Sequence, residues 1–116
     1  MRRMPPMLSL LAVLVLSPIA AQAQGSAERG LKLYMDFMCY SCHGTVGQGG
    51  ERGAGPKLAP NPFPYEAFAF QTRRPRGSMP RYPVEFLSDQ QMADIYAYVA
   101  SVKPGPAAKD IPLLRD

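Results

Sequence analysis

The stretch Cys39-Tyr40-Ser41-Cys42-His43 contains both cysteines and the single histidine of this 116-residue chain. Two thiols three positions apart project to the same side of a helical turn, and the imidazole follows directly. In a C-x-x-C-H sequence the two thiols bond covalently to the vinyl groups of a haem, and the histidine binds its iron. We therefore expect one haem c, attached through Cys39 and Cys42, with His43 as the proximal iron ligand.

A redox-active dithiol and a structural zinc site are the other uses of two closely spaced cysteines. A thioredoxin-type pair belongs to a βαβ context, and the chain has no alternating apolar pattern that would predict strands. A closed zinc site needs four nitrogen or sulfur ligands, whereas cysteine and histidine supply three here. Haem attachment is the interpretation that uses all three residues.

The sixth coordination position of a haem iron decides between electron transfer and ligand chemistry. Met35 and Met38 stand too close before the motif to reach the opposite haem face, and Met92 belongs to an apolar helical stripe. We expect Met79 to be the distal ligand rather than a methionine that only packs. Histidine and methionine together close the coordination sphere, which predicts an electron carrier and not an enzyme.

The apolar periodicity predicts two helices, over residues 27–38 and 89–103, and no strands, so the fold class is all-α. Ser26 is a suitable N-cap for the first helix. Ser88 and Gln91 form a capping-box pattern for the second, and Pro104 stops it. Residues 44–83 are rich in glycine and proline and read as loop, with one or two helical turns at 65–71. Such a long loop suits a compact domain if it wraps a large cofactor.

The first 23 residues are typical of a signal peptide. Arg2 and Arg3 precede the apolar run 8–16, and Ala21-Gln22-Ala23 offers a cleavage site. A retained membrane anchor is the alternative, but the run is shorter than the roughly 20 residues that span a bilayer. We expect export to the periplasm, a domain over 24–104, a flexible C-terminal tail over 105–116, and no membrane span after cleavage.

The net charge of +4 owes two units to Arg2 and Arg3. The other basic residues are interleaved with acidic ones except near Met79, so the sequence does not indicate a nucleic-acid binder. Near Met79 the cluster forms either a solvated loop with one arginine on a haem propionate, or a docking patch for an acidic redox partner. The cluster consists of Arg73, Arg74, Arg76 and Arg81.

Taken together, these features resemble the class I c-type cytochromes, which are monohaem and His/Met ligated. The resemblance covers about residues 26–103. It implies a cytochrome c fold in which the N- and C-terminal helices cross around one covalently bound haem, with long loops. It also implies that Gly30, beside Tyr34, permits close contact with Ile95 and Tyr98; the alternative is an incidental surface glycine.

The same resemblance implies the surroundings of the haem. The carbonyl of Pro56, in the pair Gly55-Pro56, would accept the N–H of the proximal histidine, and Leu58 would pack on the proximal face. Tyr65 or Arg76 would contact a propionate. Met79-Pro80, with Tyr82 nearby, would form the distal loop.

The function expected from these features is the periplasmic transfer of single electrons. The protein would be a free carrier or the cytochrome subunit of a periplasmic dehydrogenase, and its redox partners would be a dehydrogenase, an oxidase or a cytochrome complex. The alternative is a haem-based ligand or gas sensor, in which the Met79 ligand is labile. A haem enzyme such as a peroxidase would need a distal acid–base group, and no second histidine is present.

Overall fold

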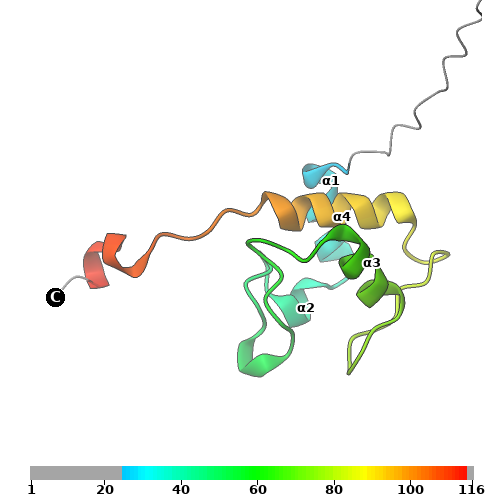
Figure 1. Cartoon of the computed structure of the whole chain (residues 1–116), viewed down its shortest axis with the longest axis horizontal. Coiled ribbons are helices and arrows are strands. Elements are labelled where there is room, and N and C mark those ends of the chain that lie inside the picture. Colours follow the sequence, from blue (N-terminus) through cyan, green and yellow to red (C-terminus); the bar gives the residue numbers. More distant parts are fainter. Residues whose placement is uncertain (1–24, 115–116) are drawn as a thin grey trace, which may run out of the picture.

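The computed structural model describes residues 25–114, which form helices and loops without a strand. The two longest helices, α1 (Ala27–Asp36) and α4 (Asp89–Ser101), cross each other, and α2 (Tyr40–His43) and α3 (Tyr65–Arg73) lie to one side of them (Figure 1). A single 3-10 turn, Glu51–Gly53, interrupts the loop after α2. The all-α prediction is therefore confirmed for the described part of the chain. The predicted signal peptide, 1–23, lies outside it.

The first helix ends two residues earlier than the predicted range of 27–38. Met38 adopts the left-handed conformation (φ 62°). The amide of Met38 donates to the carbonyl of Met35, and the amide of Cys39 donates to that of Tyr34, both at 3.0 Å. These two bonds satisfy the last carbonyls of α1 in the Schellman pattern. The chain changes direction here, so α2 is a separate helical turn that carries the cysteine motif.

Both helix starts follow the predicted caps. The Ser26 hydroxyl accepts the Arg29 amide at 3.3 Å. At α4 the Ser88 hydroxyl accepts the Gln91 amide at 3.2 Å, and the Gln91 side chain accepts the Ser88 amide at 2.9 Å. This reciprocal pair is the predicted capping box. At its other end α4 stops at Ser101, two residues before the predicted end, and α3 runs two residues beyond the predicted 65–71.

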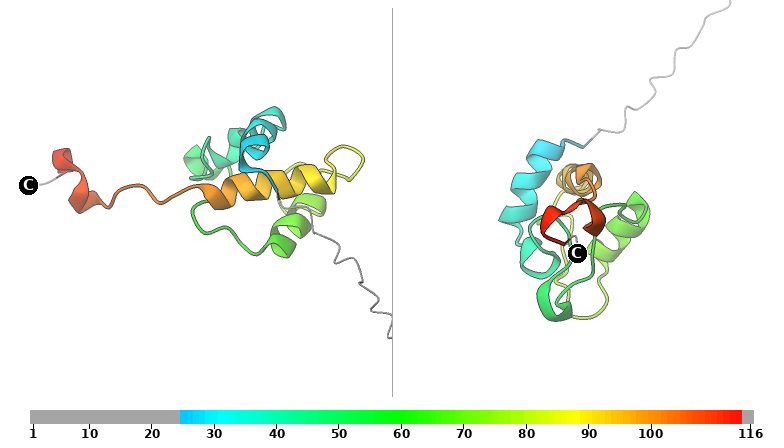
Figure 2. Two further views of the ribbon diagram at one scale, coloured as in Figure 1. Left: turned by 90° about the horizontal axis from the view of Figure 1, so that it is seen from above. Right: turned by 90° about the vertical axis from the view of Figure 1, so that its left-hand side faces the viewer.

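The core lies mainly where α1 crosses α4, a crossing that Figure 2 shows from two further directions. Gly30 is buried at this point and faces Asp94 and Tyr98 of α4. The rings of Tyr34 and Tyr98 meet edge to face at 5.3 Å. The interpretation of Gly30 as an incidental surface glycine is therefore wrong. The buried apolar residues are Tyr34, Ala59, Leu87, Met92, Ile95, Tyr98 and Val99.

A buried carboxylate joins the start of α1 to α4. Asp94 accepts the Ser26 amide at 2.7 Å, the Arg29 Nε at 2.9 Å and the Gln90 side chain at 3.1 Å. The hydrogen bond from Arg29 is the largest cause that lowers the pKa of Asp94 below its ordinary value. Asp94 therefore stays ionised and holds the two helices in one register.

The segment after α4 forms two exposed 3-10 turns, Ala108–Asp110 and Pro112–Leu114. They lie away from the crossed helices (Figure 1). Within residues 25–114, none of the helices has both the length and the apolar character needed to cross a membrane.

Candidate functional site

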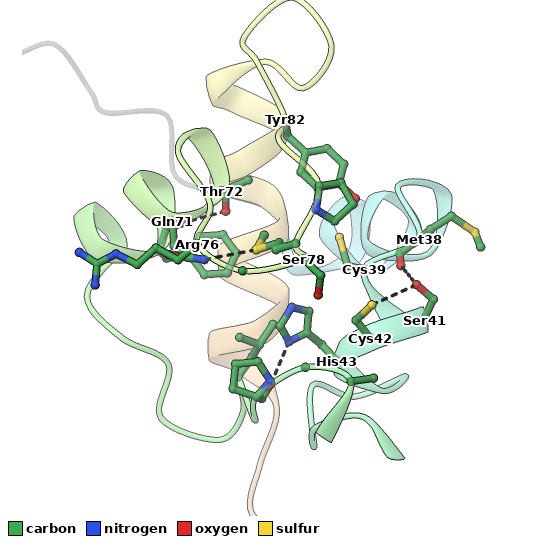
Figure 3. Close-up of a pocket in the computed structure, with 18 of the residues that line it drawn as sticks. Met38, Cys39, Ser41, Cys42, His43, Gln71, Thr72, Arg76, Ser78 and Tyr82 are labelled. Atoms are coloured by element: carbon green, nitrogen blue, oxygen red, sulfur yellow. Dashed lines mark hydrogen bonds between the residues drawn. The ribbon is translucent and has the colours of Figure 1, made fainter. Parts of the chain in front are cut away.

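A cavity of about 640 Å³ opens between α2, α3 and the loops that follow them. Its size is within the range of small-molecule and cofactor sites, roughly 300–1,000 Å³. Figure 3 shows residues of the cysteine motif on one side and residues from the end of α3 on the other. The residues that line it include Cys39, Cys42, His43, Gly55, Pro56, Leu58, Gln71, Arg76 and Met79.

The two cysteines reach this cavity from neighbouring positions on one helical turn. Both are free thiols. The amide of His43 donates to the carbonyl of Cys39 at 3.0 Å, which keeps the motif helical. Burial raises the pKa of the Cys39 thiol to about 11, so this group stays protonated at neutral pH. The site therefore offers two cysteine sulfurs on one side of the cavity.

His43 is 8% exposed and is held by one specific contact. Its Nδ1 lies 2.8 Å from the carbonyl oxygen of Pro56, the contact that the resemblance to class I cytochromes implied. A carbonyl can only accept, so Nδ1 carries the proton in this contact, and in the neutral ring Nε2 has an unshared electron pair. Gly55 permits this approach, because a β-carbon there would stand 2.6 Å from the carbonyl oxygen of Cys42. The ring is thus oriented, and its Nε2 is a potential metal ligand.

Two tyrosine hydroxyls secure the chain directly after the motif. Tyr34 donates to the carbonyl of Gly44 at 2.7 Å, and Tyr98 donates to that of Thr45 at 2.8 Å. The resemblance placed both residues at the helix crossing and gave no sign of their hydroxyl bonds. Since Tyr34 is on α1 and Tyr98 is on α4, the helix crossing holds the backbone that immediately follows His43.

Met79 lies on the loop between α3 and α4, residues 74–88, which we call the Met79 loop. It is half-buried and lines the same cavity as His43. The other candidate methionines are placed differently: Met92 is in the core, and Met38 lines the cavity next to Cys39 with its side chain directed away from His43 (Figure 3). The predicted pair of metal ligands therefore comes from two separate elements around one cavity.

The guanidinium of Arg73 is engaged in contacts within the fold. One of its guanidinium nitrogens donates to the carbonyls of Tyr82 and Leu87 at 2.8 and 2.6 Å, and another pairs with the Asp89 carboxylate at 2.6 Å. These bonds fasten the end of α3 to the far end of the Met79 loop. Sequence reasoning missed this role, because it grouped Arg73 with its basic neighbours. Arg74, Arg76 and Arg81 are exposed, and Arg76 lines the cavity.

Tyr82 attaches the Met79 loop to the rest of the fold through two further hydrogen bonds. Its amide donates to the carbonyl of Thr72 at 3.2 Å, and its hydroxyl donates to that of Phe37 at 2.9 Å. The loop is therefore attached to α3 and also to the end of α1. Both attachments limit where Met79 can lie.

Tyr65 is the one predicted site residue that the structure does not bring to the cavity. It begins α3, and its ring packs edge to face against Tyr96 of α4 at 5.3 Å. The expected contact between Tyr65 and a propionate therefore has no support in the fold. Of the two residues proposed for that contact, Arg76 alone lines the cavity.

The residues around the cavity fit a haem. The two cysteine sulfurs lie one helical turn apart, and the carbonyl of Pro56 orients the His43 imidazole. The thioether of Met79 lies on a loop that hydrogen bonds attach to α3. Imidazole and thioether are the axial ligands of low-spin cytochromes, and thiols form the covalent attachment. Leu58 and other apolar side chains line the remaining space.

The chain matches a protein-family model. Residues 25–99 match the model described as Cytochrome C oxidase, cbb3-type, subunit III, so the match covers more than half of the chain. It includes both cysteines, His43, Met79 and most of α4. No curated protein and no solved structure matches the chain.

Proposed function

This chain belongs to the Cytochrome C oxidase, cbb3-type, subunit III family, a class I c-type cytochrome family, and on that premise we propose that it is an exported carrier of single electrons. Family membership establishes a covalently bound haem c and haem-based electron transfer. The proposal adds the attachment and ligand residues, the compartment and the kind of partner. Haem, when bound, supplies a one-electron iron couple.

Cys39 and Cys42 are proposed as the attachment residues. Each thiol would add across a vinyl double bond, so that a sulfur–carbon bond forms and the thiol hydrogen moves to the neighbouring carbon. The addition needs no external oxidant or reductant. A covalent bond also keeps the cofactor in place after export, which suits a small domain with a limited core.

The observation that carries the proposal is the pairing of His43 and Met79 around one cavity. The carbonyl of Pro56 orients the imidazole through Nδ1, and the hydrogen bonds of Arg73 and Tyr82 restrain the loop that carries the Met79 sulfur. If both residues bind the iron, the protein would supply both ligands and the site would have no open position for a substrate. This favours a carrier over an enzyme.

The absorption spectrum of the purified mature protein in both redox states tests the ligand set. The ferric form should show a methionine–iron charge-transfer band, and the band should vanish in Met79→Ala. Met92→Leu, a substitution in the core, should keep it. A ferric spectrum without this band, together with rapid binding of carbon monoxide by the reduced wild type, would instead support the ligand-sensor alternative.

The exposed arginines of the Met79 loop are the proposed contact with redox partners. We define the arginine patch as Arg74, Arg76 and Arg81, which are all exposed. Arg76 lines the cavity, and the positive charge of the patch would steer an acidic partner protein towards this side of the molecule over about a Debye length. The partner would be a dehydrogenase, an oxidase or a cytochrome complex. The protein would bind it either as a free carrier or as the cytochrome subunit of a periplasmic dehydrogenase.

The compartment follows from the predicted signal peptide, residues 1–23, which we propose is removed during export to the periplasm. The mass of the protein recovered from a periplasmic fraction tests this directly. Cleavage after Ala23 would give a chain that begins at Gln24. A full-length mass in a membrane fraction would support the retained anchor instead.

A further inference from the structure

Gln71 makes a direct contact with the sulfur of Met79. Its side-chain Nε2 lies 3.8 Å from the Met79 sulfur, the bond drawn as a dashed line from Gln71 in Figure 3. A thioether sulfur can only accept a hydrogen bond, and the amide nitrogen is the donor group of a glutamine side chain. The polarity of the contact is therefore defined: Gln71 donates and Met79 accepts.

The position of Gln71 is set by its neighbours on α3. Thr72 is buried, its hydroxyl donates to the carbonyl of Phe68 at 2.8 Å, and its own carbonyl accepts the Tyr82 amide. Arg73 binds the far end of the Met79 loop. Hydrogen bonds thus join the two segments that carry Gln71 and Met79 at several points. These bonds hold the two side chains close to each other.

We propose that Gln71 is a positioning residue that raises the reduction potential of the haem through Met79. A hydrogen bond that the Gln71 N–H donates to the Met79 sulfur draws electron density away from the sulfur. The sulfur then becomes a poorer donor to ferric iron, which needs that density more than ferrous iron does. The inference rests on the proposed function, because it requires Met79 to be the distal ligand.

The sign of the change in potential separates this role from a simple effect of cavity polarity. Loss of the donor strengthens the sulfur as a ligand of ferric iron, so the potential falls. Loss of a polar group from the cavity disfavours the more highly charged ferric state, so the potential rises. The two explanations therefore predict opposite shifts for the same substitution.

The experiment is a redox titration of the haem-loaded protein against a mediator, followed by the absorption spectrum. Gln71→Leu removes the donor, and Gln71→Asn keeps an amide that is one methylene too short to reach the sulfur. In both variants the ferric-to-ferrous ratio at a fixed mediator potential should rise, roughly twofold to fivefold for one weak hydrogen bond. Gln90→Leu is the matched control, since Gln90 bonds Asp94 and does not line the cavity. It should leave the ratio unchanged.

A structural readout accompanies the potential. In the reduced wild-type protein, the Gln71 side-chain amide protons should show a nuclear Overhauser effect to the Met79 methyl group, and Gln71→Asn should lack it. An unchanged or higher potential in Gln71→Leu, with the charge-transfer band retained, would overturn the role of Gln71 and leave the proposed function intact. Absence of the band in the wild type would overturn both. A potential that rises in Gln71→Leu and keeps the wild-type value in Gln71→Asn would assign the effect to the polarity of the cavity and not to the hydrogen bond.

Discussion

Gly30 of α1 approaches α4 so closely that a β-carbon on it would stand 1.9 Å from the carbonyl oxygen of Asp94. The same atom would lie 2.8 Å from the β-carbon of Tyr98. Neither neighbour is the flexible end of a long side chain, so the helices would have to separate to admit a methyl group. The close crossing in turn places the two tyrosine hydroxyls that hold the chain after His43.

Gly30→Ala should therefore lower the free energy of unfolding by about 2 kcal/mol. Overpacking destabilises the folded state by up to roughly 3 kcal/mol, and the better helix propensity of alanine stabilises it by about 1 kcal/mol. Guanidinium unfolding of the haem-loaded protein, followed by circular dichroism, measures the change. Gly105→Ala is the control, because a β-carbon there meets nothing within 4 Å. Equal stability of the two variants would show that the crossing tolerates a methyl group.

Met38 holds a backbone conformation that glycine adopts at no cost. Its φ is 62°, and its side chain is 53% exposed. Met38→Gly should raise the free energy of unfolding by about 1 kcal/mol, because the left-handed conformation costs other residues roughly 1–2 kcal/mol. Met35→Gly, inside α1, should lower it by about 1 kcal/mol. Thermal unfolding of both variants beside the wild type checks the two signs, and a lower stability for Met38→Gly would contradict the first.

Local sequence patterns predicted the parts of this protein that depend on neighbouring residues. The capping box of Ser88 and Gln91 is an example, since both bonds join residues three positions apart. The end of α1 was not predictable in the same way. Met38 continues the apolar periodicity, which favours a longer helix. The chain must nevertheless turn at Met38 so that α2 can take its own direction, and α1 therefore ends earlier.

The contacts that hold the candidate site were mostly not predictable, because they join distant segments. Tyr98 reaches Thr45 across 53 positions, and Tyr82 reaches Phe37 across 45. No periodicity encodes a hydroxyl bond to a particular carbonyl. Tyr65 is a further case: the resemblance assigned it to a propionate contact, and the structure places it at the start of α3, packed against Tyr96 of α4.

Arg73 and Arg74 are adjacent in sequence but should respond differently to substitution. Arg73→Gln removes three charge-assisted hydrogen bonds that close the Met79 loop. We expect it to lower the free energy of unfolding by about 2 kcal/mol, since a bond to a charged group contributes roughly 1.5–3 kcal/mol. The methionine–iron band should also be lost at a lower temperature than in the wild type. Arg74→Gln should leave both measurements unchanged, and similar effects of the two substitutions would contradict the distinct roles.

The arginine patch predicts a dependence on ionic strength. Replacing Arg74, Arg76 and Arg81 by glutamine should slow electron transfer to an acidic partner protein by roughly tenfold or more at low salt, since electrostatic steering raises association rates by 10–10³-fold. The difference should shrink as ionic strength approaches 1 M, where the Debye length is about 3 Å. Stopped-flow kinetics over a series of salt concentrations measures both. A rate that neither the substitutions nor the salt alters would exclude docking through this patch.

The buried carboxylate of Asp94 predicts how stability depends on acid. Its pKa is lower in the folded protein than its ordinary value, chiefly because Arg29 donates to it. A lowered carboxyl pKa contributes stability above the unfolded pKa of about 3.9, and that contribution is lost as the pH falls through the folded value. Asp94→Asn should therefore be less stable than the wild type at neutral pH, and the gap should narrow steadily below about pH 4. Urea unfolding midpoints at a series of pH values measure the gap, with Asp36→Asn as the control because its ion pair with Lys32 is exposed. A gap of constant size down to the acid limit would mean that the ionisation of Asp94 does not stabilise the helix crossing.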